Sequence, residues 1–230
     1  MMKNILSEII CLKNQTIVNP KEFFIACSGV PTLVYSGFTS TLLALKKDVK
    51  ERIPELKPEN PGSVWPKTTL GSLRDDKKLF FDDAKILRDI CNQFKPAENS
   101  PLKIDQLQIV IFQCRSLEKR LLTHSVSMMK SDSYTGDNIP EDHEKQVNET
   151  VYQFSENNLS AYWKYLSRDG NRESHYRKTH IEATLVYDIP NDHKIHDLLD
   201  EFIKKIDTEL ENYFCWFSRE SRHMTIRSLV

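Results

Sequence analysis

The stretch RHMTIRSL, residues 222–229, repeats the pattern of PKTTLGSL, residues 66–73. When His223 is aligned with Lys67, the two octets agree at four positions, namely Thr69/Thr225, Leu70/Ile226, Ser72/Ser228 and Leu73/Leu229. We expect each octet to form a strand, because short runs of apolar and β-branched residues favour strands. The same short strand therefore occurs twice, headed once by a histidine and once by a lysine.

The segments around the two octets are also alike. Before the first octet we predict a strand at 32–36, a helix at 40–51 and a proline-rich loop. Before the second we predict a strand at 180–189 and a helix at 193–210. Helices mixed with separate strands, without a regular βαβ rhythm, indicate an α+β fold. We expect two pseudo-symmetric lobes whose antiparallel sheets form a central cleft, with the helices on the outside.

The remaining segments give weaker patterns. Apolar spacing and turn residues predict helices at 3–13, 82–94, 116–130 and 146–166, and strands at 104–114 and 214–217. The polar stretch 131–145 is expected to be an exposed loop, and 167–178 a charged loop.

Composition indicates a compact protein without a dominant charge. Hydrophobic residues make up 39% of the chain, which is enough for one core shared by two lobes. Lys and Arg (32) nearly balance Asp and Glu (33), so the net charge does not indicate nucleic-acid or membrane binding. A local basic patch is compatible with this balance. No stretch approaches the ~20 apolar residues of a membrane span, and we expect no membrane partner.

Cysteine usage predicts a reducing compartment. The five cysteines are scattered singly and form no CxxC pair, which fits reduced thiols in a cytoplasmic or nuclear protein. The N-terminal apolar run is broken by Ser7 and Glu8 and lacks a small-residue cleavage site, so no signal peptide is predicted.

The two octets carry side chains that suit a phosphate. Residues i and i+2 of a strand point to the same face, so His223 and Thr225 project together, with Arg227 next along that face. Lys67 and Thr69 likewise share a face. Hydroxyls donate to phosphate oxygens, cations neutralise them, and an imidazole moves protons near neutral pH. If the octets are neighbours, one cleft receives all these groups.

This pattern resembles the two-histidine phosphoesterase superfamily, the LigT-like cyclic phosphodiesterases. The hallmark of that family is a pair of His-x-Thr/Ser-hydrophobic strands on two pseudo-symmetric α+β lobes. The resemblance covers residues 31–114 as lobe one and 180–230 as lobe two, within a single domain of 1–230. Residues 115–179 are expected to be an insertion or elaboration, and the first thirty residues have no counterpart.

The resemblance implies a metal-independent phosphoesterase that acts on nucleotide or RNA 2′,3′-cyclic or 2′-5′ phosphates, without a cofactor. One histidine acts as general base and the other as general acid, while the Thr/Ser hydroxyls hold the phosphate. Carried onto this chain, it implies a catalytic set of His223, Thr225, Lys67 and Thr69.

Lys67 departs from the family pattern, because it stands where the first histidine is expected. An ordinary lysine has a pKa of ~10.4, so it is a poor base unless burial and Arg227 lower that value. Three interpretations are open. Lys67 stabilises charge while His223 transfers protons, or His175 or His180 replaces the lost histidine, or the site binds phosphorylated ligands without turning them over.

The charged loop at 167–178 has two readings. It gathers several cations and an aromatic residue, among them His175, Tyr176 and Arg177. In one reading it lies at the mouth of the cleft, grips phosphates and stacks a base on Tyr176. In the other it is a solvated turn before a strand. We take Tyr176, Arg177 and His175, together with Arg227, as candidate substrate-binding residues.

Other chemistry-bearing residues have simpler explanations. Trp65 is expected to pack between loop and core rather than to stack a base. His193 and His196 lie three residues apart, but no third metal ligand is evident. Cys27 has no partner histidine that the sequence suggests. The alternatives to an enzyme are a non-catalytic module that binds phosphates or RNA ends, and a protein-interaction domain. The oligomeric state is left open.

Overall fold

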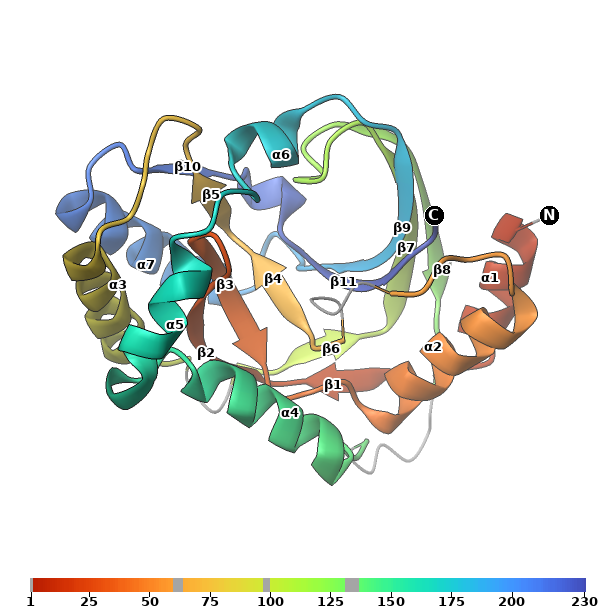
Figure 1. The fold of residues 1–230 in the computed structure, drawn as a ribbon. Helices are drawn as coiled ribbons and strands as arrows, with labels where there is room; N and C mark the ends of the chain where they lie inside the picture. The colour runs from red at the N-terminus through yellow and green to blue at the C-terminus, as the bar shows by residue number, and fades with distance from the viewer. Residues whose placement is uncertain (1, 60–63, 97–99, 131–136) are drawn as a thin grey trace.

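The computed structural model describes residues 2–59, 64–96, 100–130 and 137–230, and it is built around a seven-stranded sheet (Figure 1). Every strand pairing in this sheet is antiparallel. In spatial order its strands are β2 (Pro20–Ala26), β3 (Val30–Tyr35), β4 (Lys67–Thr69), β11 (His223–Ser228), β9 (Glu182–Asp188), β7 (Gln106–Phe112) and β8 (Arg120–Ser127). The strands that begin the two octets, β4 and β11, are therefore neighbours in the middle of the sheet.

Two small antiparallel sheets flank the large one. β1 (Thr16–Val18) pairs with β6 (Leu102–Ile104), and β5 (Gly71–Leu73) pairs with β10 (Phe214–Trp216). The first octet is thus two strands rather than the single strand that we predicted. The reason is a change of partner at Leu70, whose N–H donates to Pro31 O at 2.9 Å while its carbonyl accepts from Phe217 N at 3.0 Å.

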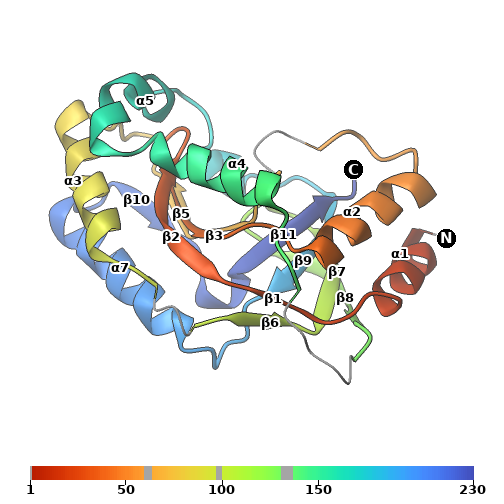
Figure 2. The same cartoon turned by 90° about the horizontal axis from the view of Figure 1, so that it is seen from below.

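Within the described residues, seven α-helices and two 3₁₀ turns cover this framework (Figures 1 and 2). The helices are α1 (Met2–Cys11), α2 (Ser40–Arg52), α3 (Phe81–Gln93), α4 (Glu141–Tyr152), α5 (Leu159–Leu166), α6 (Glu173–Arg177) and α7 (Ile195–Glu209). In both views α3 and α7 lie together beside β2, whereas α1 and α2 lie at the opposite side of the molecule. The α+β class with antiparallel sheets is therefore confirmed.

Consecutive phenylalanines on β2 show why both faces of this strand are covered. Phe23 points toward α7, where its ring stacks on Phe202 with centroids 3.9 Å apart. Phe24 points the other way, and its ring meets Trp65 edge-on at 6.0 Å and Tyr162 of α5 at 5.7 Å. Alternation along the strand thus places one aromatic cluster under α3 and α7 and another under α4 and α5.

Two helix predictions in the middle of the chain are wrong. Residues 116–130 do not form a helix, because β8 pairs with β7 in a hairpin whose turn is closed by Gln113 N donating to Lys119 O at 2.8 Å. Leu117 takes the left-handed conformation (φ 58°) in that turn. Leu121 and Leu122, two apolar residues of this stretch, are exposed on the edge strand instead of packing into the core.

The long helix predicted at 146–166 is broken into α4 and α5 by a 3₁₀ turn, Glu156–Asn158. Asn158 Nδ2 donates to Tyr152 O at 3.1 Å, so its side chain satisfies a carbonyl that a continuing helix would have used.

The predicted exposed loop at 131–145 falls partly on residues 131–136, outside the described residues, and α4 begins within it at Glu141. The charged loop at 167–178 contains the short helix α6. Over the described ranges, no helix is long and apolar enough to cross a membrane.

We predict that the Phe23–Phe202 stack contributes strongly to stability. Phe23→Ala should lower the free energy of unfolding by about 3–5 kcal/mol, since it removes a buried ring and leaves a cavity. Phe80→Ala is the matched control, because that ring is 69% exposed and its loss should change stability by less than about 0.5 kcal/mol. Urea denaturation of both variants measures the difference, and equal effects would contradict the packing described.

Candidate functional site

One small cavity brings the four motif side chains together. Its volume is about 100 Å³, and it is lined by Trp65, Lys67, Thr69, His223 and Thr225. The geometry follows from the pairing of β4 with β11, in which Thr68 lies opposite Met224. Because those two residues are fully buried, their neighbours on either side point to the opposite face of the sheet.

Two larger cavities adjoin this small one and share its residues. A cavity of about 280 Å³ includes Trp65, Lys67 and Thr69, and is otherwise lined largely by aromatic and apolar side chains. A cavity of about 350 Å³ includes Thr69, His223 and Thr225, and also has polar residues such as Arg115 and Glu182. The motif residues therefore lie between an aromatic hollow and a polar one.

His223 is held in a defined tautomer. Its Nδ1 lies 2.6 Å from the carbonyl oxygen of Ser221, which can only accept, so Nδ1 carries the proton. The neutral ring then has its lone pair on Nε2. Burial lowers the pKa of His223 below its usual value, and this outweighs the hydrogen bond to Ser221 and the negative charge of Asp188, which raise it. His223 is therefore a neutral imidazole at pH 7, able to accept a proton at Nε2.

An ion pair beside His223 had not been singled out in the sequence. Asp188 lies opposite His223 on β9, and its two oxygens accept from Arg120 Nη1 and Nη2 at 2.6 and 2.7 Å. Asp188 raises the pKa of His223 and Arg120 lowers it. The sequence did show a carboxylate, Asp188, near the end of the apolar strand predicted at 180–189. Its partner Arg120 could not be foreseen, because it lies in a segment that was predicted to be a helix.

Lys67 lies against an aromatic face. Its Nζ is 3.9 Å from the centroid of the Trp65 ring, a cation–π contact. Burial lowers the pKa of Lys67 to about 8, and the nearby charge of Lys46 adds to this effect. The lysine is thus mainly protonated at pH 7 yet close to its titration range. Trp65 is 9% exposed and packs on Phe24, as expected, but it also lines the cavity.

The expectation that Arg227 shares the face of His223 and Thr225 is wrong. A β-bulge between Thr225 and Arg227 places Thr225 opposite Val186 but Arg227 opposite Leu185. The extra residue reverses the alternation, so Ser228 lines the polar cavity. Arg227 is 3% exposed and pairs instead with Glu59, its Nη1 lying 3.3 Å from Oε2.

Of the predicted loop residues, Tyr176 reaches the site directly. It lines both larger cavities, and its ring packs against Phe217 with centroids 5.1 Å apart. His175 lies beside the polar cavity, with Nε2 2.9 Å from Arg115 Nη1. Burial and the charge of Arg115 lower the pKa of His175. His180 Nε2 lies 2.7 Å from Glu182 Oε1. Neither histidine takes the place of Lys67 on β4.

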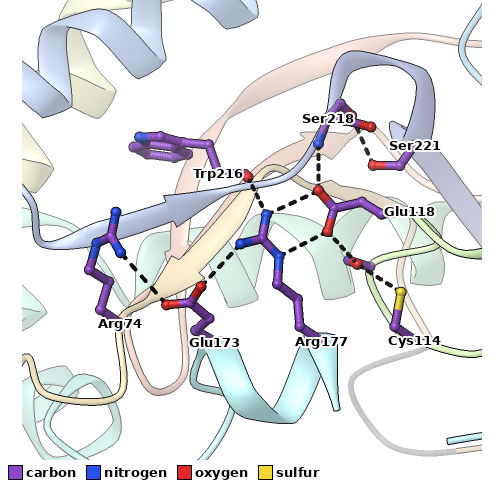
Figure 3. A network of polar contacts seen from close by, with 9 residues as sticks. Arg74, Cys114, Glu118, Glu173, Arg177, Trp216, Ser218 and Ser221 are labelled. Carbon is purple, nitrogen blue, oxygen red and sulfur yellow. Dashed lines mark hydrogen bonds and ion pairs between the residues drawn. The ribbon is translucent and has the colours of Figure 1, made fainter. Parts of the chain in front are cut away.

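Arg177 is directed into a structural network rather than toward a ligand (Figure 3). Its Nε and Nη2 donate to the two oxygens of Glu118 at 3.0 and 3.1 Å, and Nη1 donates to Glu173 at 3.0 Å. Nη2 also donates to Trp216 O at 3.2 Å. Two carboxylates thus balance its charge, and the network fastens α6, which carries Tyr176, to β10 and the β7–β8 turn.

The part of the chain that the structure describes has no group of three or more His, Cys, Asp or Glu side chains placed to hold a metal ion. His196 is buried with Nδ1 3.0 Å from Arg222 Nη1, and His193 Nε2 lies 3.3 Å from Pro101 O. The Sγ atom of Cys27 lies 3.3 Å from Tyr165 O.

The chain matches no protein-family model, no curated protein and no solved structure. The site itself places a neutral imidazole, a buried ammonium and two hydroxyls around one cavity, between an aromatic and a polar hollow.

We predict that the Arg120–Asp188 pair sets the pKa of His223 in opposite directions. Asp188→Asn should lower that pKa further, because it removes a negative charge, whereas Arg120→Met should raise it by removing a positive one. Charges at this range shift a pKa by a few tenths to about one unit. NMR titration of the His223 ring measures both variants, and shifts of the same sign would contradict the assignment.

Proposed function

We propose that this protein is a phosphoesterase of the cyclic phosphodiesterase type, acting on nucleotide or RNA 2′,3′-cyclic or 2′-5′ phosphates without a metal ion. The observation that carries the proposal is the cavity between β4 and β11, which receives Lys67, Thr69, His223 and Thr225 from octets far apart in the chain. The resemblance to the two-histidine phosphoesterases, with Lys67 in place of one histidine, agrees with this reading.

The cavity suits a phosphate for a physical reason. Burial and the nearby positive charge of Lys46 both disfavour the charged form of Lys67 and lower its pKa. An anion in the cavity would stabilise that charged form. Thr69 and Thr225 each bring a hydroxyl that can donate to a non-bridging oxygen. The bound anion would therefore be held from both strands at once.

In the proposed reaction, His223 accepts one proton and Lys67 donates another. Water attacks phosphorus while His223 Nε2 takes one of its protons, and the bond from phosphorus to the leaving oxygen breaks. The Lys67 ammonium gives its proton to that oxygen, so a cyclic diester becomes a monoester with a free hydroxyl. Lys67, Thr69 and Thr225 stabilise the negative charge that develops on the other oxygens.

We also infer that the chain consists of two related lobes that share the central sheet, with bounds that differ from the expected 31–114 and 180–230. β2 (Pro20–Ala26) precedes residue 31, and β7 (Gln106–Phe112) stands with β9 and β11 in the second half of the sheet. β2, β3 and β4 stand on one side of the junction in the same order as β7, β9 and β11 on the other. In each half a helix follows the middle strand, α2 after β3 and α7 after β9. The site would then lie where the two lobes meet.

A second candidate is a non-catalytic module that binds phosphates or RNA ends. The observation that favours it is the lysine itself, since an ammonium that is mainly protonated at pH 7 serves well as a permanent phosphate ligand. The two candidates differ in whether Lys67 must release a proton.

We predict turnover of 2′,3′-cyclic nucleotides and of short RNAs ending in a cyclic phosphate, in the presence of EDTA. His223→Ala should reduce kcat/KM by about 10²–10⁴-fold, the usual contribution of a general base. His124→Ala on the edge strand β8 is the matched control and should leave the rate unchanged.

The outcome separates the candidates. Absence of turnover, with thermal stabilisation by the same ligands, would favour the binding module. Absence of both would leave a protein-interaction domain as the better description. Activity that EDTA abolishes would contradict the metal-free mechanism.

We predict that Lys67 acts as an acid and sets the alkaline limit of activity. The wild-type rate should fall above pH about 8, because the ammonium is lost there, and should stay level down to the lowered pKa of His223. Lys67→Arg keeps the positive charge but cannot release a proton near neutral pH, so turnover should fall by about 10²-fold or more. Phosphate should still raise the melting temperature of this variant. Full activity of Lys67→Arg would show that only the charge is needed.

A further inference from the structure

We propose that the aromatic cavity beside Lys67 binds the nucleobase of the substrate, and that the segment between the two lobes helps to build it. This inference rests on the proposed function, because it assumes that a phosphate occupies the small cavity. The aromatic cavity shares Trp65, Lys67 and Thr69 with that small cavity. A group bound there is thus next to the phosphate and can belong to the same molecule.

Nearly half of the residues that line this cavity come from residues 115–179, which lie outside the resemblance to the phosphoesterases. Gln153 follows the end of α4, Tyr162 and Tyr165 belong to α5, and Asn171 and Tyr176 follow in the charged segment. The family pattern alone would not supply these side chains. They give the middle segment a role that its sequence did not reveal.

Hydrogen bonds hold these walls in place. Tyr162 Oη donates to Ile25 O at 3.1 Å, and Tyr165 O accepts from Ser28 N at 2.9 Å. Both contacts fasten α5 to the β2–β3 hairpin, which forms the floor. The Arg177 network fastens Tyr176 from the other side (Figure 3). The cavity is therefore formed before any ligand arrives, which lowers the entropic cost of binding.

The lining favours a nucleobase over other groups. Aromatic walls suit a flat ring, and the amides of Gln153 and Asn171 offer paired donors and acceptors for the edge of a base. A plain alkyl chain would leave those amides without partners. The cavity on the other side, which holds His223, has Arg115, Glu182 and Thr184 and suits water or a polar chain.

This asymmetry also orients the reaction. With the base in the aromatic cavity, the nucleoside and its leaving oxygen lie on the Lys67 side of phosphorus. The attacking water then comes from the polar cavity beside His223. The two groups would thus stand on opposite sides of phosphorus, which is the arrangement that an in-line displacement needs.

Cys27 provides a direct test, because it lines the aromatic cavity and is half-buried, whereas Cys91, Cys114 and Cys215 are buried. In a Cys11→Ser background, which removes the exposed thiol, alkylation of Cys27 by N-ethylmaleimide is followed by mass spectrometry. Saturating adenosine 2′-monophosphate should slow the reaction at least tenfold. Saturating inorganic phosphate should leave it within twofold of the ligand-free rate.

The outcomes separate this inference from the proposed function. Thermal stabilisation by phosphate, lost in Thr225→Val, together with no extra protection by the nucleotide, would overturn the nucleobase site alone. Absence of any binding by phosphate or nucleotide would overturn both. Protection by the nucleotide without any turnover would support the nucleobase site and leave the protein as a binding module.

A matched pair of variants provides a second measurement. Gln153→Ala should weaken the binding of adenosine 2′-monophosphate by about 2–10-fold, the value of one or two hydrogen bonds, and leave inorganic phosphate unchanged. Asn148→Ala, at an exposed residue of α4 outside the cavity, should change neither. Equal losses for nucleotide and phosphate in Gln153→Ala would contradict a contact with the base.

Discussion

The antiparallel pairing of β4 with β11, in which Thr68 faces Met224, is the contact on which the proposed site depends. It joins two octets that lie far apart in the chain and turns their buried residues into the core. The side chains on either side of that pair are therefore presented together on the opposite face. Without this pairing, Lys67 and His223 would lie on separate sheets, and the protein would have no shared cavity.

Several features of the site were accessible from sequence, because they follow from period-two alternation and from the repeat itself. The α+β class, the two octets and the common face of Lys67, Thr69, His223 and Thr225 could be predicted in this way. The position of Arg227 could not be predicted, because a β-bulge reverses the alternation of side chains along β11. No glycine in that stretch indicates the bulge. Nor could the role of Arg120 be predicted, because its segment was predicted to be a helix and instead forms the edge strand β8. Long-range partners of this kind are decided by tertiary pairing.

The replacement of a histidine by Lys67 is accompanied by a changed environment around the lysine. Trp65 offers its ring to the ammonium, while burial and Lys46 bring the pKa down to about 8. An ordinary lysine would be a poor proton donor to an alkoxide near pH 7, but one with this pKa is well matched to the task. His223 has the complementary property, since burial keeps it neutral. We propose that the two groups divide proton transfer between them.

The most direct test of the central claim is a crystal structure of the protein with adenosine 2′-monophosphate. The account predicts the phosphate in the cavity between β4 and β11, within hydrogen-bond distance of Lys67 Nζ, His223 Nε2 and the hydroxyls of Thr69 and Thr225. The adenine ring should lie beside Trp65 and Tyr176. A phosphate bound elsewhere on the molecule, with this cavity filled only by water, would contradict the account.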